Sequence, residues 1–273
     1  MMRKVYRCAP LPFMGQKRRF VRDFMNVVDA MPEGTVFVDL FGGSGLLSHV
    51  AKRMRPAARV IYNDYDGYCD RIANVGVTNE ILSDIRTLLA PACKDKKVPN
   101  ELRREILQLI KRRDDEGYVD YVTLSSSLLF SGKYATCYEE LAKHTMYNVC
   151  KVSDYDCEGY LDGLEVVHCD YRELFARFKD VPGVVFLIDP PYLSTDVGSY
   201  KCYWKLVDYL DVLKCLEGTR YVYFTSAKSQ VLELCKWMRD NDEIGDPFNG
   251  AVVHTQESHI NYHGQFTDIM LVK

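Results

Sequence analysis

A run of apolar residues that ends in two prolines constrains the fold of this chain more than any other feature. Residues 184–188 are continuously apolar, and Asp189, Pro190, Pro191 and Tyr192 follow them directly. Such a run is typical of a strand covered on both faces of a parallel sheet, and the prolines cannot continue the ladder because they lack backbone donors. The pattern therefore predicts a buried strand that delivers Asp189 to the carboxyl edge, where ligands bind in open α/β sheets.

The two prolines also fix two φ angles, so the residues after the strand should form a nearly rigid arc. In that arc the Asp189 carboxylate and the Pro190 carbonyl would lie beside the Tyr192 ring. Two acceptors beside an aromatic face suit a planar amine. Asp-Pro-Pro also occurs by chance as a strand-ending turn, so this tetrad alone leaves a purely structural interpretation open.

Length and composition favour an ordinary cytoplasmic protein. The 273 residues suffice for one large α/β domain or a domain with an insertion. The N-terminus lacks the apolar core of a signal peptide, and no apolar run approaches the ~20 residues of a membrane span. Ten cysteines occur without Cys-x-x-Cys spacing, which indicates reduced thiols and no zinc site.

Charge alone does not indicate a nucleic-acid partner, because the formal net charge is only −3. Basic residues nevertheless gather in local clusters. For any one cluster, a solvated helix face is the simpler explanation. The clusters are Arg3, Lys4 and Arg7; Lys17, Arg18, Arg19 and Arg22; Lys52, Arg53 and Arg55; and Arg103, Arg104, Lys111, Arg112 and Arg113.

A glycine loop follows the first expected strand. Helical spacing of apolar residues predicts a helix over 18–31, and residues 35–40 predict a strand that ends in Asp39 and Leu40. Phe41-Gly42-Gly43-Ser44-Gly45 comes next and leads into a helix over 46–55. Glycines let a backbone approach a ligand closely, and the first helical turn offers free N–H groups. A dinucleotide-binding loop would need a glycine where Ser48 stands.

Acids follow two further expected strands. Asp64 comes after the strand at 59–62, where a carboxylate can accept both hydroxyls of a ribose. Asp170 comes after the strand at 165–168. In each place a helix N-cap, by Asp64, Asp66 or Asp170, is an equally good interpretation.

Between these strands, residues 72–162 show helical patterns and no convincing core strand. The clearest pattern predicts a helix over 100–113, whereas 121–130 fit a helix or a strand. We therefore expect a mostly helical insertion. After it, strands are expected at 220–225, 251–255 and 266–273, and the short link between the last two predicts an antiparallel pair.

Together, the glycine loop, the acids after the strands and the Asp-Pro-Pro-Tyr tetrad resemble a Dam-type DNA adenine-N6 methyltransferase. The resemblance covers essentially the whole chain. It implies an α/β fold with a Rossmann-like S-adenosylmethionine methyltransferase sheet, mostly parallel with an antiparallel last strand. It also implies a catalytic domain of 1–71 and 163–273, with the target-recognition domain inserted at 72–162.

The same resemblance implies roles for individual residues. The catalytic tetrad is Asp189, Pro190, Pro191 and Tyr192. Contacts to S-adenosylmethionine are implied for Phe13, Gly15, Lys17, Asp39, Phe41, Gly43, Gly45, Asp64 and Asp170. The chain departs from the family pattern in having Met14-Gly15-Gln16-Lys17 for the usual Trp-Ala-Gly-Gly-Lys, and Ser131 for an asparagine in the insertion.

The implied reaction methylates an adenine flipped out of double-stranded DNA. Asp189 and the Pro190 carbonyl would accept hydrogen bonds from the amine, Tyr192 would stack on the ring, and no metal is required. Phosphate contacts are expected from Arg103, Arg112 and Arg113, and a base-edge contact from Lys133. We expect a monomer.

Other interpretations remain open. The same chemistry would serve cytosine-N4 or adenine in RNA, and a non-catalytic DNA-binding module could keep the fold. Glutamine methylation is less favoured, because enzymes of that class have asparagine where Asp189 stands. The insertion could also be only a helical cap that shields the cofactor loop.

Overall fold

The computed structural model describes residues 5–130, 133–191, 204–227, 229–241, 245–261 and 264–273. Its internal contacts divide the chain into two compact units. The first, here called the sheet unit, comprises Met1–Cys8, Gln16–Asp66 and Leu161–Lys273. The second, the helical unit, comprises Ala9–Gly15 and Gly67–Tyr160. The helical unit thus includes a short N-terminal segment that the predicted insertion of 72–162 leaves out.

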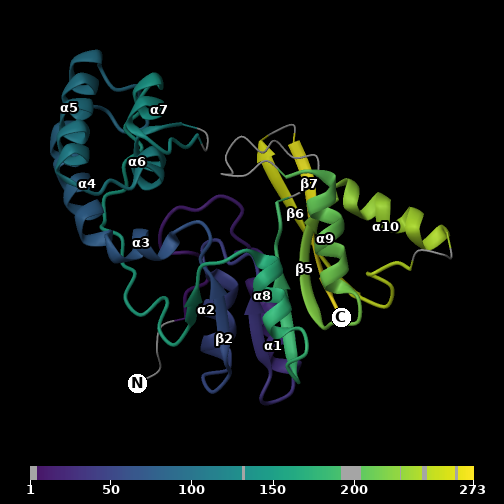
Figure 1. The fold of residues 1–273 in the computed structure, drawn as a ribbon. Coiled ribbons are helices and arrows are strands. Elements are labelled where there is room, and N and C mark those ends of the chain that lie inside the picture. Colours follow the sequence, from purple (N-terminus) through teal and green to yellow (C-terminus); the bar gives the residue numbers. More distant parts are fainter. Residues whose placement is uncertain (1–4, 131–132, 192–203, 228, 242–244, 262–263) are drawn as a thin grey trace. The chain divides into compact units, whose positions relative to one another are not determined.

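The sheet unit is built on seven strands in the order β3-β2-β1-β4-β5-β7-β6 (Figure 1). Five strands run parallel to one another: β1 (Val36–Asp39), β2 (Val60–Asn63), β3 (Glu165–Val167), β4 (Val184–Ile188) and β5 (Tyr221–Ser226). The antiparallel strands are β6 (Val252–Asn261) and β7 (Gly264–Val272), and β7 also pairs with β5. This topology confirms the predicted Rossmann-like sheet, mostly parallel with an antiparallel last strand.

Side chains of β4 alternate between two hydrophobic cores, one on each face of the sheet. Val185 and Leu187 belong to the core that includes α1 (Val21–Ala30) and α2 (Leu46–Met54). Phe186 and Ile188 belong to the core that includes α8 (Tyr171–Phe178), α9 (Leu206–Leu216) and α10 (Gln230–Asp240). Every residue of β4 is buried, as its apolar run predicts for a strand covered on both faces. Polar residues that follow β4 are therefore placed at the carboxyl edge of the sheet.

The helical unit has a hydrophobic core of its own. Its helices are α3 (Tyr68–Ala73), α4 (Val75–Leu89), α5 (Asn100–Glu116), α6 (Tyr121–Leu128) and α7 (Tyr138–Lys143). Fully buried core residues include Ile81, Ile85, Ile106, Ile110 and Leu124. The segment 121–130, which fits either a helix or a strand by sequence, is helical as far as Leu128. Asp120 favours the helix as its N-cap, because the Asp120 carboxylate accepts a hydrogen bond from the Thr123 backbone N–H.

Within the part of the chain that the structure describes, no helix is both long and apolar enough to cross a membrane.

Candidate active site

Aspartates stand at or beyond the carboxyl ends of four parallel strands. Asp39 is the last residue of β1, Asp64 follows β2, Asp170 lies beyond β3, and Asp189 directly follows β4. Parallel strands bring their carboxyl ends to one edge of a sheet. The helix α2 also begins at this edge, with Gly45 as its N-cap. The edge therefore combines carboxylates with a glycine loop.

Asp189 forms an ion pair with Lys17, with 2.5 Å between Asp189 Oδ2 and Lys17 Nζ. The Lys17 side chain is 10% exposed and that of Asp189 is 19% exposed. Burial raises the pKa of the Asp189 carboxyl, the Lys17 ammonium opposes that rise, and Asp268 adds to it. Lys17, predicted from sequence as a cofactor residue, thus contacts the predicted catalytic carboxylate.

The residues that follow Asp189 begin the predicted arc. Pro190 is buried and Pro191 is half-buried. Tyr192 lies outside the described residues, so the proposed stacking of its ring stays a prediction from sequence.

Asp39 is 1% exposed and only partly satisfied by the protein. The Ser48 hydroxyl donates to Asp39 Oδ2 at 2.7 Å, whereas Asp39 Oδ1 forms no hydrogen bond within the described residues. Burial raises the pKa of Asp39 to about 7; Asp189 adds to the rise, and Ser48, the Phe41 backbone N–H and Lys17 oppose it. A buried acceptor without a partner is costly on its own, which favours a ligand that donates to it or carries positive charge.

The residues predicted for the site do not include Ser48, although its position in the sequence is informative. It occupies the position at which a dinucleotide-binding loop would have glycine. From the first turn of α2 its hydroxyl reaches back to the end of β1.

The glycine loop between β1 and α2 has the backbone conformation that its glycines allow. Gly43 and Gly45 have φ values of 48° and 70°, in the left-handed region that glycine adopts without strain. The N–H groups of the first turn of α2 are therefore presented at the loop. Phe41 packs against Tyr171 and Trp204, with ring centroids 4.9 and 5.6 Å away. These contacts anchor the start of the loop.

Asp64 is 6% exposed and does not occupy a helix cap. The N-cap of α3 is Gly67, so neither Asp64 nor Asp66 takes that position. His168 Nδ1 lies 2.7 Å from the Asp64 carbonyl oxygen, and because a carbonyl only accepts, Nδ1 carries the hydrogen. The His168 ring stacks on Tyr65 with 5.5 Å between centroids. His168, which the sequence did not indicate as a site residue, thus holds the backbone of Asp64, the residue predicted to bind the ribose hydroxyls.

Asp170, in contrast, is the N-cap of α8. Its Oδ1 accepts from the Arg172 backbone N–H at 2.7 Å, and its Oδ2 lies 3.5 Å from the Arg172 guanidinium. The side chain is 47% exposed. Arg172 also pairs with Asp208 and Asp211. The structure therefore shows the capping interaction, and a cofactor contact for Asp170 stays a prediction.

Phe13 and Gly15, also predicted as cofactor residues, group with the helical unit rather than with Lys17. Phe13 packs edge-on against Tyr68, with 5.7 Å between ring centroids. The Tyr68 hydroxyl in turn donates to the Leu11 carbonyl at 3.1 Å. The segment before Gly15 is therefore tied to α3.

Two of the arginines predicted to contact DNA have partners within the helical unit. Arg103 donates from Nε to the His144 carbonyl at 3.2 Å, and its guanidinium also donates to the Ala142 carbonyl. These carbonyls lie at the end of α7. Arg113 pairs with Asp84 at 2.8 Å. Both side chains therefore already stabilise the helical unit.

The other two predicted DNA contacts are more accessible. Arg112 is exposed and forms no ion pair with any residue that the structure describes. Lys133 is exposed as well. Ser131 and Gly132, which precede Lys133 in the sequence, lie outside the described residues.

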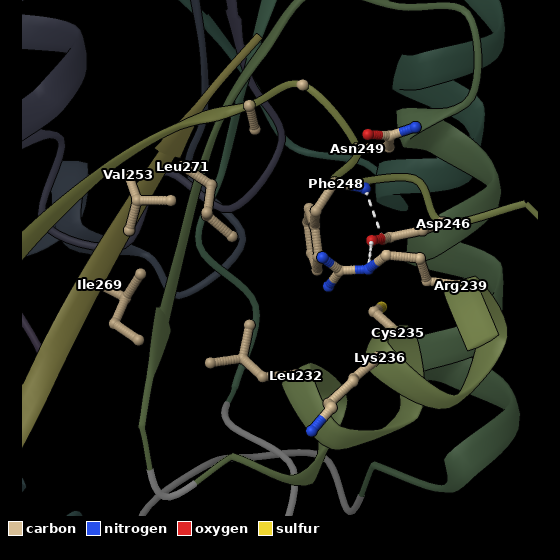
Figure 2. A pocket seen from close by; sticks show the side chains of 12 residues that line it. Leu232, Cys235, Lys236, Arg239, Asp246, Phe248, Asn249, Val253, Ile269 and Leu271 are labelled. Atoms are coloured by element: carbon tan, nitrogen blue, oxygen red, sulfur yellow. Dashed lines mark hydrogen bonds and ion pairs between the residues drawn. The ribbon is translucent and has the colours of Figure 1, made fainter.

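A separate hollow of about 420 Å³ lies between α10, the loop before β6 and the β6–β7 pair (Figure 2). Phe248, Val253 and Leu271 line it, together with the ion pair between Arg239 and Asp246. None of the predicted site residues lines this hollow. Among the described residues, no group of His, Cys, Asp or Glu side chains is arranged to hold a metal ion.

Comparison with known proteins decides the family. The model of the D12 class N6 adenine-specific DNA methyltransferases matches residues 13–211. A protein of Haemophilus influenzae, whose name proposes a methyltransferase activity and no substrate, is 39% identical over 247 residues, which are 88% of this chain and 82% of that protein. The chain belongs to the D12 class of N6-adenine-specific DNA methyltransferases.

Two solved structures show a distant similarity to this D12 methyltransferase. A precorrin-6y C5,15-methyltransferase from Geobacter metallireducens is 10% identical, with a TM-score of 0.36 and coverage of 96% of this chain and 95% of the other. An rRNA methylase from Streptococcus thermophilus is also 10% identical, with a TM-score of 0.35 and coverage of 96% and 99%. The fold assignment rests on the strand order and not on these low similarities.

Membership makes the protein an enzyme of adenine methylation in DNA, and implies a methyl donor of the S-adenosylmethionine type. The residues present fit such a donor. Asp39 Oδ1 is a buried acceptor without a partner among the described residues, suited to an ammonium group, and Asp39 lies shortly before the left-handed glycines of the loop. Asp64 is a second carboxylate at the same edge of the sheet, suited to ribose hydroxyls.

Proposed function

We propose that this D12 enzyme transfers a methyl group from S-adenosylmethionine to the N6 amine of an adenine that is flipped out of double-stranded DNA, at a specific sequence. The observation that carries the proposal is the pair of carboxylates at the ends of adjacent strands. Asp39 is buried with an open acceptor, and Asp189 is partly exposed and paired with a lysine. One suits a bound cation and the other suits an incoming amine.

Asp189 orients the acceptor amine. Its carboxylate and the Pro190 carbonyl accept the two N–H groups, which directs the nitrogen lone pair away from both acceptors. Lys17 lowers the pKa of the carboxyl against the effect of burial and limits its rotation through the 2.5 Å contact. Tyr192 stacks on the adenine ring. Catalysis is then chiefly orientation and electrostatics, and no covalent intermediate with the enzyme is needed.

When bound, S-adenosylmethionine supplies an activated methyl group on a sulfonium centre. The Asp39 carboxylate would accept from its ammonium group, and Asp64 would accept from its ribose hydroxyls. Gly43 and Gly45 let the loop backbone approach the methionine portion. Asp189 is also placed to hold, at a carboxylate oxygen, the proton that the amine loses after methyl transfer, and its raised pKa favours that step.

The helical unit supplies most of the choice of DNA sequence. Arg112 is available to a phosphate because it has no ion-pair partner among the described residues, and Lys133 is exposed. The sheet unit adds two exposed arginines, Arg18 just before α1 and Arg22 in its first turn. The arginine contacts to phosphates would position the duplex without reading its sequence, and Lys133 would read a base edge.

Mass spectrometry of nucleosides tests the proposal. Duplex DNA of mixed sequence is incubated with the protein and S-adenosylmethionine, and N6-methyladenine is expected in the digest. N4-methylcytosine instead, or product only with RNA, would change the acceptor. No product together with intact DNA binding would favour a non-catalytic module. Sequencing of methylated positions then gives the recognised site.

A further inference from the structure

Tyr62 in β2 lies beneath the glycine loop and is completely buried. Its Cα is the register partner of Asp39 in the parallel β1–β2 ladder. A Cβ atom built on Gly42 would lie 2.3 Å from two carbons of the Tyr62 ring, and one on Gly45 would lie 3.3 Å from it. Glycine at position 42 is therefore required by a side chain of the protein itself, because the loop closes directly over the ring.

The Tyr62 hydroxyl meets two acceptors at once. It lies 2.7 Å from the Gly43 carbonyl oxygen and 3.1 Å from Asp64 Oδ1. A phenol has one hydrogen to donate, so the two acceptors share it. Gly43 belongs to the loop proposed to hold the methionine portion of the cofactor, and Asp64 is the proposed ribose ligand. One buried hydroxyl thus joins the two halves of the cofactor site.

We propose that Tyr62 is a positioning residue for S-adenosylmethionine, which sets the glycine loop through its ring and couples the Gly43 carbonyl to the Asp64 carboxylate through its hydroxyl. This inference rests on the proposed function. When ribose hydroxyls donate to Asp64, the Tyr62 hydrogen can turn wholly to the Gly43 carbonyl. Ribose binding therefore strengthens the bond that holds the loop around the methionine portion.

Tyr221 provides a matched control. It is also completely buried in the sheet unit, and its hydroxyl donates to the Pro247 carbonyl at 2.8 Å. Its strand, β5, is separated from β2 by β1 and β4. Tyr221→Phe and Tyr62→Phe each remove one hydroxyl that bonds to a backbone carbonyl. If the role of Tyr62 is merely structural, each variant should lose thermal stability and neither should lose ligand affinity.

The experiment is calorimetry with S-adenosylhomocysteine, and with 5′-methylthioadenosine, which keeps the ribose and lacks the methionine portion. For Tyr62→Phe we expect affinity for S-adenosylhomocysteine to fall about tenfold, equal to about 1.4 kcal/mol. Methylthioadenosine should lose less, because it makes no use of the loop. The turnover number at saturating S-adenosylmethionine should stay within about twofold of the parent value, so that the loss appears in the KM for the cofactor. Tyr221→Phe should leave both affinities unchanged.

A double-mutant cycle with Asp64→Ala tests the coupling itself. Once the carboxylate is gone, Tyr62→Phe should cost clearly less than in the parent protein. Additive losses, or a Tyr62→Phe variant that binds like Tyr221→Phe, would overturn the inference while leaving the proposed function intact. If the parent protein fails to bind S-adenosylhomocysteine at all, the proposed function fails, and the inference falls with it.

Discussion

The ends of β1 and β3 differ in how their aspartates are partnered. At the end of β1, Asp39 is 1% exposed and has one oxygen without a hydrogen bond among the described residues. Beyond β3, the Asp170 side chain is 47% exposed, and both of its oxygens lie near Arg172. A strand followed by an aspartate is the same pattern in sequence. The protein completes the contacts of Asp170 and leaves those of Asp39 open for a ligand.

The end of β4 is an intermediate case, because the partner of Asp189 is a charge from a distant segment. Lys17 offsets the cost of burying the Asp189 carboxylate without covering it, since 19% of that side chain stays exposed. A carboxylate that is paired yet accessible can still accept from an incoming amine.

The largest effect is expected for Asp189→Ala. Methyl transfer should be abolished, because the amine loses its charged acceptor, while affinity for S-adenosylhomocysteine changes by no more than about threefold. Radiolabel transfer and calorimetry measure the two quantities. Retained turnover with lost cofactor affinity would reverse the roles assigned to Asp189 and Asp39.

Asp39→Asn should weaken S-adenosylmethionine binding at pH 8 by about 1.5 to 3 kcal/mol, the range for hydrogen bonds to a charged group. The pKa of Asp39 is about 7 in the folded protein. Affinity of the parent protein should therefore rise as pH rises through about 7, whereas the Asp39→Asn variant should lack this dependence. Titrations at several pH values check the slope.

The raised pKa of Asp39 also makes the stability of the folded protein depend on pH. Because the folded state holds the Asp39 proton more tightly than the unfolded chain, the unliganded protein loses stability as pH rises from the ordinary pKa of 3.8 to about 7. Asp39→Asn should therefore raise the melting temperature at pH 8 and not at pH 4. If Asp39→Asn changes the melting temperature by the same amount at pH 4 and at pH 8, the charged Asp39 carboxylate does not destabilise the folded protein.

Lys17→Met should shift the pH profile of methyl transfer. Lys17 lowers the pKa of Asp189 against the effect of burial, so its removal raises that pKa. The acidic limb of the rate profile should then move to higher pH, and activity should recover in part when the pH is raised. A uniform loss at every pH would instead indicate that Lys17 contributes through cofactor binding, as the sequence predicts.

The fold and the placement of aspartates at the ends of strands could be predicted from sequence, because both depend on local pattern. The apolar run of β4, the glycines at 43 and 45, and the helical periodicity of α5 each have a short-range signal. The pairing of Lys17 with Asp189 and the position of Tyr62 beneath Gly42 join residues that are far apart in sequence. Such contacts follow from the crossover order of the sheet, which periodicity does not specify.

Asp170→Ala should moderately lower stability and leave cofactor binding intact. Loss of the N-cap of α8 should cost about 1 kcal/mol of stability, with cofactor affinity unchanged. Asp64→Ala should do the opposite, because Asp64 does not cap α3, and weaken S-adenosylmethionine binding by about 1.5 to 3 kcal/mol. Thermal unfolding and calorimetry on both variants separate the two roles. Reduced cofactor affinity in Asp170→Ala would support the contact that the family resemblance implies.

The smallest effects are expected among the basic residues of the helical unit, where the same contrast between partnered and open groups recurs. Arg112 has no ion pair among the described residues, so Arg112→Ala should leave stability unchanged and weaken binding to all DNA sequences alike. It should also reduce the slope of log affinity against log salt by about 0.9, the value for one phosphate contact.

Arg103 holds the carbonyls at the end of α7, so Arg103→Ala should lower the melting temperature. Lys133→Ala should change the ratio of methylation at correct and altered sites, because Lys133 is expected to reach a base edge. If all three variants bind and discriminate DNA like the parent protein, the helical unit is a shielding cap and does not choose the site.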